Sequence, residues 1–466
     1  MANRHSHQQT PLLDLGERCF APVEPADFPQ AILRYRNDRA AAEIGLDGLS
    51  SETWIQHFAR FEPFADNLPK PLALAYHGHQ FRVYNPDIGD GRGFTFAQFR
   101  DARGRLMDLG TKGSGRTPYS RTGDGRLTLK GAIREILATE LLEALGVPTS
   151  RTLSVIETGE QLARDDEPSP ARSAVLVRLS HSHVRFGSFQ RLAFLSDTEG
   201  LRVLLAYAVR NFYPHLSEDD APGFLRSVAQ NMAKMTARLM TSGFVHGVLN
   251  TDNMNVTGEC FDYGPWRFLP TLKPGLTAAY FDVSGLYAYA RQAEAIYWNL
   301  SALADALRTV ADLDALKAAL DQFPAYYGAA FAEALMHRLG VRGAGDKSDQ
   351  DFVTGFFGFL NETQVPFERA FFDLFGGRAG LQKRERSPHA RAYRDAAIIE
   401  QLDGYEPVGA DRLADPFFEG APETLLYDEV EALWSELEPG ENWAALEEKI
   451  ARIRRMGAAY RLEAAL

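Results

Sequence analysis

The sequence predicts an α+β protein in which a mixed N-terminal lobe with an antiparallel sheet precedes a mostly helical C-terminal lobe. Two segments, about 94–112 and 152–179, have the alternation and turn residues of β-hairpins. From about residue 200 onward, apolar residues recur at helical spacing. Strands first and helices later is the order that such an architecture produces. We therefore expect an N-terminal extension over 1–70, packed on the core, a sheet-containing lobe over 71–190 and a helical lobe over 191–466.

Composition excludes several classes of protein. The chain has 466 residues, with 50 Lys and Arg against 62 Asp and Glu, giving a net charge of −12. This acidic balance argues against sequence-independent binding to nucleic-acid phosphates. No apolar run approaches the ~18 residues of a membrane span, and the N-terminus has no signal pattern. With only Cys19 and Cys260 there is no disulfide framework or cysteine zinc site. We expect a cytoplasmic protein without a nucleic-acid or membrane partner.

The individual elements follow from local patterns. In the first hairpin, the turn Asp101–Gly104 separates an alternating strand from Arg105–Lys112, and a glycine-rich loop follows over 113–125. Apolar residues at three- and four-residue steps predict an amphipathic helix over about 128–145, which Gly146 and Pro148 end. Further helices are expected over about 201–213, 224–240, 286–310, 313–338 and 424–465.

Two glycine-containing loops are the first candidates for ligand contact. Gly89, Gly91 and Arg92 lie in a loop whose backbone could approach a ligand closely, with Arg92 on phosphate oxygens. An ordinary tight turn before a strand is the alternative. Lys112 stands at the end of a strand beside Gly113-Ser-Gly115, where it could contact a phosphate, although this is not a Walker A loop. A surface lysine is the alternative there.

Charged residues farther along the chain could complete an anion site. Glu135 lies off the apolar stripe of its helix and could face the sheet and pair with Lys112, or it could be solvated. Arg178 and Arg185 flank a segment with two histidines and suit recognition of a polyanion. A metal site at those histidines lacks a carboxylate at ligand spacing.

The segment 243–264 carries the most specific pattern. A loop led by His246 contains Asp252 and Asn253, and an Asp-aromatic-Gly turn begins at Asp262. Asn253 and Asp262 could supply two oxygen ligands to Mg²⁺, as the equivalent residues of protein kinases do. The position at which a kinase has its catalytic aspartate is Val248, which accepts no proton. Asp252 is the nearest carboxylate.

Together these motifs resemble those of the selenoprotein O (SelO, YdiU) family. The matching strings are Ala73-Leu-Ala-Tyr-His-Gly-His-Gln-Phe, Gly89-Asp-Gly-Arg-Gly, Lys112-Gly-Ser-Gly-Arg-Thr-Pro-Tyr-Ser-Arg, Gly123-Asp-Gly-Arg, Ile133-Arg-Glu, Ser182-His-Val-Arg-Phe-Gly and His246-Gly-Val-Leu-Asn-Thr-Asp-Asn-Met, followed by Phe261-Asp-Tyr-Gly-Pro. They cover roughly residues 70–290 in unbroken order.

The resemblance implies a protein-kinase-like bilobal fold that binds ATP in a flipped orientation and transfers AMP to Ser, Thr or Tyr hydroxyls of acceptor proteins. Mg²⁺ or Mn²⁺ would assist, and UTP is a possible alternative donor. By this resemblance Asp252 is the base, Asn253 and Asp262 hold the metal, and Glu135 pairs with the lysine. The positions implied to contact nucleotide are Gly89, Gly91, Arg92, Lys112, Asp124, Gly125, Arg178 and Arg185.

Two other functions stay open on the sequence alone. Ordinary phosphotransfer would fit the lysine, glutamate and metal ligands, and a non-catalytic nucleotide sensor would fit the missing kinase aspartate. One family feature is absent, because many members carry a selenocysteine or cysteine near the C-terminus and this chain has none after Cys260.

Overall fold

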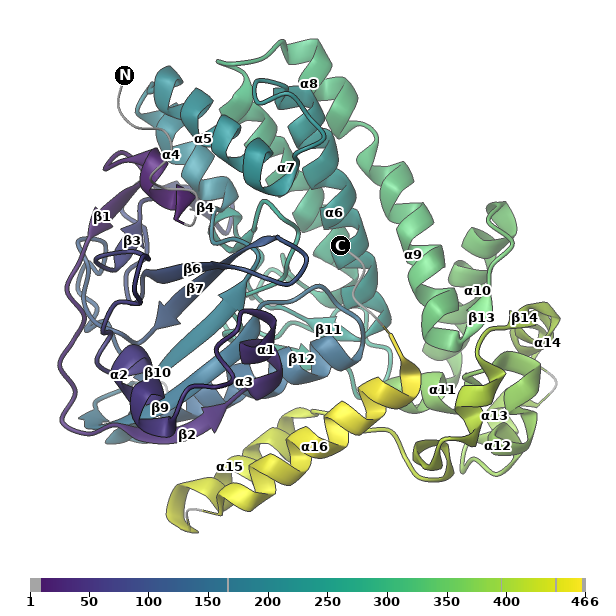
Figure 1. The fold of residues 1–466 in the computed structure, drawn as a ribbon. Coiled ribbons are helices and arrows are strands. Elements are labelled where there is room, and N and C mark those ends of the chain that lie inside the picture. The colour runs from purple at the N-terminus through teal and green to yellow at the C-terminus, as the bar shows by residue number, and fades with distance from the viewer. Residues whose placement is uncertain (1–9, 166, 395, 441, 463–466) are drawn as a thin grey trace.

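The computed structural model describes residues 10–165, 167–394, 396–440 and 442–462 (Figure 1). It has a mixed fold of antiparallel strands and many helices, as the sequence predicts. The strands of the main sheet all lie before residue 181, and long helices dominate the rest of the described chain.

One eight-stranded sheet organises the N-terminal part. Its order is β1 (Phe20–Pro22), β3 (Leu72–Leu74), β6 (Thr95–Arg100), β7 (Leu106–Lys112), β10 (Ala171–Ser180), β9 (Arg151–Leu162) and β2 (Ile32–Arg36), with β8 (Leu127–Thr128) paired to β10. All of these pairings are antiparallel. Both predicted hairpins are confirmed as β6–β7 and β9–β10. The short strands β1, β2 and β3 come from the first 75 residues and extend the sheet at both edges.

The two faces of this sheet bury different side chains because residues alternate along each strand. Leu106 and Leu176 face a large core that includes helix α3 (Leu129–Ala144). Met107 and Val177 face a second core that contains Trp54 of α2 (Ser51–Phe58), and α1 (Asp38–Glu43) packs on the same side. Helix α3 confirms the helix predicted over 128–145. Lys112 is six residues after Leu106, and Arg178 is two residues after Leu176. Both side chains therefore lie on the face of the sheet that α3 covers.

The C-terminal part is built from helices. The segments predicted over 201–213 and 224–240 are confirmed as α5 (Thr198–Phe212) and α6 (Ala221–Thr241), and α4 (Phe186–Phe194) precedes them. The helix expected over 286–310 is α7 (Gln292–Leu307), preceded by the 3-10 turn η3 (Tyr289–Arg291). Helices α6 and α9 pack along each other, and α4 packs on α7.

Two predicted single helices are wrong, because each is two helices. The segment 313–338 divides into α8 (Leu313–Leu320) and α9 (Phe323–Leu339), where Pro324 occupies the first turn of the new helix and has no N–H to continue the old one. The segment 424–465 divides into α15 (Tyr427–Gly440) and α16 (Trp443–Tyr460) after Pro439-Gly440. Its residues 441 and 463–465 lie outside the described chain.

Several short elements were not predicted. They are α10 (Lys347–Thr363), α11 (Phe367–Leu374), α12 (Leu381–Glu385), α13 (Ala390–Tyr393), α14 (Ala397–Gly404), the 3-10 turns η1 (Pro11–Leu15), η2 (Thr251–Asn253), η4 (Gly377–Gly380), η5 (Ala410–Ala414) and η6 (Pro416–Glu419), and the two-stranded pairs β4 (Gly78–Gln80) with β5 (Val83–Asn85), β11 (Phe244–Val245) with β12 (Arg267–Phe268) and β13 (Val341–Arg342) with β14 (Glu406–Pro407).

Helix α16 packs along α3, from the far end of the described chain. Arg454 donates to the two carboxylate oxygens of buried Glu140 at 2.6 and 2.8 Å, and to the hydroxyl of Tyr35 on β2 at 3.1 Å. A charge-assisted bidentate contact of this kind fixes the orientation of both partners. The helix that carries Glu135 is therefore held between the sheet and α16.

The two cysteines are both free and buried. Burial raises the pKa of the Cys19 thiol to about 11 and that of Cys260 to about 12. At neutral pH neither thiol forms the reactive thiolate. Among the described residues, no helix combines the length and apolar character that crossing a membrane requires.

Candidate active site

A buried lysine joins three elements of the fold. Lys112, at the end of β7, pairs with Glu135 on α3, and both side chains are almost fully buried. The Lys112 ammonium also lies 2.8 Å from Oδ1 of Asp262, in the loop that follows η2. The orientation predicted for Glu135, toward the sheet, is therefore confirmed. One cation here bridges the sheet, the helix behind it and the C-terminal part of the chain.

Asp262 keeps its negative charge in this environment. Burial alone would raise the pKa of its carboxyl, but Lys112, Arg178 and Arg185 outweigh burial and hold that pKa well below its usual range. Its side chain is 26% exposed, whereas that of Lys112 is 6% exposed. Asp262 is thus an ionised carboxylate that solvent still reaches, as a metal or nucleotide ligand must be.

The two arginines predicted for the site both lie beside Asp262. Arg178 stands on β10 one strand from Lys112, and its guanidinium is 3.4 Å from Asp262 Oδ1. Arg185, which precedes α4, donates to Asp90 at 2.9 Å and to the backbone carbonyl of Asp252 at 3.0 Å. Both guanidiniums lie over the ring of Phe261. We refer below to the charged cluster, which comprises Asp90, Lys112, Glu135, Arg178, Arg185, Asp252 and Asp262.

Asp252 is the member of the charged cluster with the least satisfied side chain. It lies in η2, and its Oδ1 is buried without a hydrogen-bond partner among the described residues. Its Oδ2 accepts a long hydrogen bond of 3.4 Å from Gln80. Burial raises the pKa of this carboxyl to about 6. A buried carboxylate oxygen with no donor is available to take a proton from a substrate.

The neighbouring residues fix the loop that carries Asp252. Asn253 donates through its side-chain amide to the backbone carbonyl of Val248 at 2.9 Å. Val248, which occupies the position of the kinase catalytic aspartate, therefore helps to hold this loop through its backbone. The His246 ring contacts the carbonyl of Phe261 at 3.0 Å, which ties this loop to the Asp262 turn. These contacts bring the two predicted metal ligands onto adjoining, connected segments.

The donor atoms suit a hard divalent cation. Asn253 uses its amide nitrogen on Val248, and among the described residues nothing donates to its amide oxygen. With the carboxylate of Asp262 this gives two oxygen ligands, which Mg²⁺ and Mn²⁺ prefer. The described residues contain no group of three His, Cys, Asp or Glu side chains that could hold a metal. The remaining ligands would have to be water and phosphate oxygens, as is usual for Mg²⁺ with nucleotides.

The predicted glycines serve close packing between loops. A side chain at Gly89 would meet the Tyr119 ring at 2.4 Å, and one at Gly91 would meet the Tyr119 carbonyl at 2.9 Å. The carbonyl of Arg92 accepts from the Gly113 amide at 2.7 Å, while the Arg92 side chain is exposed and contributes to the low pKa of Asp262. The loop before β6 is thereby fixed beside the loop after Lys112.

Asp124 and Gly125 close the second glycine-rich loop. The Gly125 carbonyl accepts from the Gly115 amide at 3.1 Å, and Gly125 has a φ of +73°. Asp124 is exposed, and its carboxylate accepts from Arg164 at 2.8 Å and from the Arg126 amide at 2.9 Å. Neither partner belongs to the charged cluster, so Asp124 lies apart from the groups that Lys112 brings together.

Sequence reasoning missed three participants. Asp90 pairs with Arg185, and its signal was present, because it lies inside the Gly89–Gly93 motif. Tyr76 contacts Arg185 through its hydroxyl at 3.1 Å, and although it lies in the matching string that begins at Ala73, nothing in that string indicates this contact. His183 accepts from Arg178 at 3.1 Å and lies near Asp108, so its ring orients an arginine.

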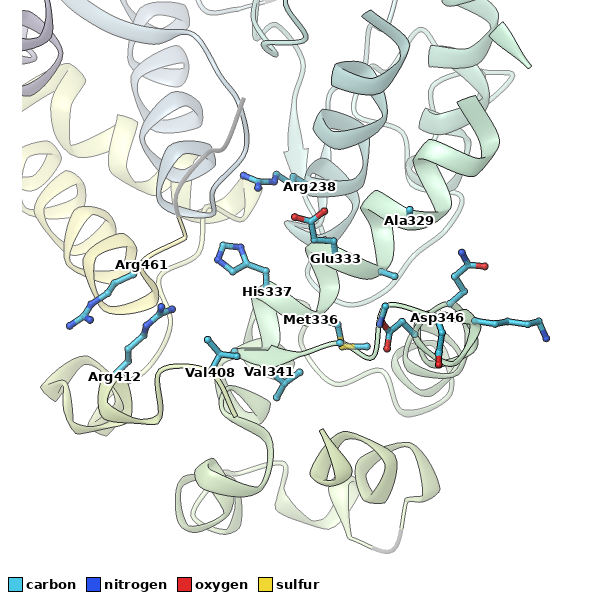
Figure 2. Close-up of a pocket in the computed structure, with 17 residues that line it drawn as sticks. Arg238, Ala329, Glu333, Met336, His337, Val341, Asp346, Val408, Arg412 and Arg461 are labelled. Atoms are coloured by element: carbon cyan, nitrogen blue, oxygen red, sulfur yellow. The ribbon is translucent and has the colours of Figure 1, made fainter. Parts of the chain in front are cut away.

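A large cavity lies elsewhere in the molecule. Figure 2 shows it between α6, α9 and the start of α10, with a volume of about 1220 Å³. Its lining includes Arg238, Glu333, His337 and Arg412 and contains none of the residues predicted for the site. The chemistry predicted from sequence therefore gathers around Lys112 and not around this cavity.

Comparisons with known proteins identify the family. A family model described as "Protein adenylyltransferase SelO" matches residues 4–401. A "Protein nucleotidyltransferase YdiU" of Trichormus variabilis is 45% identical over 368 residues, covering 78% of this chain and 75% of the relative. Proteins of the same name from Trichodesmium erythraeum and Gloeobacter violaceus are 39% and 40% identical, covering 92% and 95% of this chain and 94% and 93% of the relatives.

Proposed function

This chain belongs to the SelO family of protein adenylyltransferases, and from that membership we propose that it transfers AMP from ATP to Ser, Thr or Tyr hydroxyls of acceptor proteins. The observation that carries the proposal is the arrangement around Lys112, which contacts both Glu135 and Asp262. Beside them lies the unpartnered carboxylate oxygen of Asp252. A phosphate-binding cation, a metal-binding carboxylate and a base are thereby within one charged cluster.

The nucleotide would bind through the cations of this site. Lys112, Arg92, Arg178 and Arg185 neutralise the triphosphate, and the loops containing Gly89, Gly91, Asp124 and Gly125 contact the nucleotide. Asn253 and Asp262 would hold Mg²⁺ or Mn²⁺, which when bound offsets phosphate charge in the transition state. Within the charged cluster Asp262 has the most exposed side chain, and Arg92, which acts on it, is exposed as well, which supports ligand entry from their side.

The chemical step assigns a role to Asp252. The acceptor hydroxyl oxygen attacks the α-phosphorus and forms a new P–O bond, while the bond to the β-phosphate oxygen breaks. Pyrophosphate leaves with that electron pair, and the hydroxyl proton passes to Oδ1 of Asp252, which is buried and has no described partner. A positioned general base of this kind contributes roughly 10²–10⁴-fold to the rate. Val248, at the position of the kinase base, accepts no proton, which favours this route over ordinary phosphotransfer.

We also propose the kinase-like bilobal organisation, with lobes over 71–190 and 191–466 and an extension over 1–70. The contact of a strand lysine with a glutamate on the following helix supports it, since kinase sites position their phosphate lysine in this way. The edge strands β1 and β2 come from the extension and pair with the main sheet, which supports an extension packed on the core.

Labelled ATP tests the proposal directly. The chain is incubated with Mg²⁺, a mixture of acceptor proteins and ATP labelled at either the α- or the γ-phosphorus. We expect protein-bound label from the α position only, with release of pyrophosphate and an adduct of AMP mass. Label from the γ position only would make this chain a kinase, and ATP binding without transfer would make it a nucleotide sensor. The same assay with UTP measures the alternative donor.

A further inference from the structure

Large apolar side chains are exposed together beside the loop that carries Asp252. Tyr280, Phe281 and Val283 are 84%, 48% and 94% exposed, and Val83 of β5 is 70% exposed. The ring of Phe281 contacts that of Phe81, in the β4–β5 turn, with centroids 5.7 Å apart. We call these five residues the apolar patch. Single exposed apolar residues are ordinary, whereas a group from two separate segments indicates an interaction surface.

The β4–β5 hairpin is hydrogen-bonded to the loop that contains Asn250 and Asp252. The Phe81 amide donates to the Asn250 side chain at 3.0 Å, and the Tyr287 hydroxyl donates to the same oxygen at 2.7 Å. Gln80, the preceding residue, contacts the carboxylate of Asp252. The patch is therefore at most a few side chains from the proposed base.

The turn of the β4–β5 hairpin has a strained backbone conformation. Phe81 and Arg82 have φ values of 51° and 64°, in the left-handed region that non-glycine residues rarely occupy. The contacts of Phe81 with Tyr287 and Phe281 keep the turn in place. Strain of this kind persists where surrounding structure over-determines it, and it concentrates at functional sites.

The loop at 279–287 has its own internal support. The carboxylate of Asp282 accepts from the amides of Leu286 and Tyr287, each at 2.8 Å. The charged side chains beside the patch balance one another, since Glu294 pairs with both Arg82 and Arg291 and the carboxylate of Asp282 also acts on Arg291. Hydrophobic contact, and not charge, is therefore what this surface offers to a partner.

We propose that the apolar patch docks the acceptor protein, by binding apolar side chains that flank the hydroxyl to be modified. This inference rests on the proposed function. A protein hydroxyl that reaches Asp252 must bring its neighbouring chain over the adjoining surface, and the patch adjoins Asp252 through Gln80 and Phe81. The acceptor segment accordingly carries apolar residues close to its Ser, Thr or Tyr.

Two synthetic peptides test this preference. Both are 15-residue fluorescein-labelled peptides with a central Ser and equal net charge, one with Leu and Val at the flanking positions and the other with Asn and Gln. Fluorescence anisotropy with the full chain measures binding, and α-labelled ATP with Mg²⁺ measures transfer. The variant is Tyr280→Ser/Val283→Ser, and the control is Leu313→Ser/Leu381→Ser, which changes two residues that are 49% and 41% exposed on other helices.

We expect the unsubstituted chain to bind the apolar peptide at least about tenfold more tightly than the polar one, as burial of one or two aliphatic side chains allows. The patch variant loses this preference and retains its affinity for ATP, whereas the control keeps both. Equal binding of the two peptides, or an unchanged preference in the patch variant, overturns the docking proposal. If the chain binds the apolar peptide more tightly but transfers AMP to neither peptide, the result counts against the proposed function. Failure of the docking proposal and failure of the proposed function therefore give different results.

Discussion

The ammonium of Lys112 lies 2.8 Å from the carboxylate of Asp262 and contacts Glu135 at the same time. One cation therefore serves two anions, and its charge is shared between a buried carboxylate and a partly exposed one. In the proposed function the phosphate would take Lys112 and the metal would take Asp262, so ligand binding would separate that pair and leave the Lys112–Glu135 pair in place.

Substitutions in the buried pair should be strongly coupled. Lys112→Met leaves the buried carboxylate of Glu135 without its cation, which lowers the free energy of unfolding by about 3–5 kcal/mol. Glu135→Gln costs less, because the Lys112 ammonium keeps Asp262 at 2.8 Å. The double variant loses less than the sum. Urea unfolding of all four proteins gives the coupling energy. The exposed pair Lys347–Asp351 is the control, at about 0–1 kcal/mol. Additive losses at the buried pair would contradict this prediction.

Asp252→Asn should separate binding from chemistry. The amide has nearly the shape of the carboxylate but cannot accept the hydroxyl proton, so AMP transfer falls by about 10²–10⁴-fold. ATP affinity, measured by calorimetry, stays close to that of the unsubstituted chain, because the cations that hold the nucleotide are unchanged. Asp219→Asn, at an exposed position, is the control and retains activity. Full transfer by Asp252→Asn would exclude this carboxylate as the base.

Local sequence patterns could predict the elements that form between neighbours in the chain. The two hairpins and α3 follow from alternation, turns and helical spacing, whereas the place of Glu135 off the apolar stripe left open whether it faces the sheet or solvent. The edge pairings of β1 with β3 and β2 with β9 could not be predicted, because they join segments that no local pattern relates. The contact of Tyr76 with Arg185 could not be predicted for the same reason, since only the fold brings the two residues together.

Gly125 should tolerate alanine poorly. It has a φ of +73°, and an added Cβ would lie 2.3 Å from the Gly115 carbonyl carbon. Gly104 is the matched control, with a φ of +77° and nothing within 4 Å. We expect Gly104→Ala to cost about 1–2 kcal/mol from backbone strain alone.

Gly125→Ala costs more than Gly104→Ala, because the clash adds to the strain and displaces the loop beside Lys112. Its ATP affinity should fall at least about tenfold, which corresponds to ~1.4 kcal/mol. Thermal unfolding and calorimetric titration with ATP measure the two effects. Equal behaviour of the two alanine variants would show that the close approach of Gly115 and Gly125 does not shape the site.

Lys383 should make stability depend on pH. Its ammonium lies over the rings of Phe372 and Phe418, and burial lowers its pKa from 10.5 to about 7. Between these values the unfolded chain binds a proton that the folded chain does not. This group therefore makes the protein more stable as pH rises from about 7 to 10.5.

Lys383→Met should remove that dependence. We expect the variant to be more stable than the unsubstituted chain by about 4 kcal/mol at pH 7, with the difference shrinking toward pH 10. Urea unfolding at several pH values measures it, and Lys347→Met, at a side chain that is 85% exposed, is the control. A difference that stays constant across this range would contradict the prediction.

The contact between Arg454 and Glu140 has a consequence for biosynthesis. These residues are 314 positions apart, and α3 is synthesised long before α16 exists to cover it. A chain is synthesised from its N-terminus. During synthesis, α3, which orients Glu135 toward Lys112, is therefore exposed on the side that α16 later covers. The charged cluster is therefore completed late, and an incomplete translation product lacks the helix that covers α3.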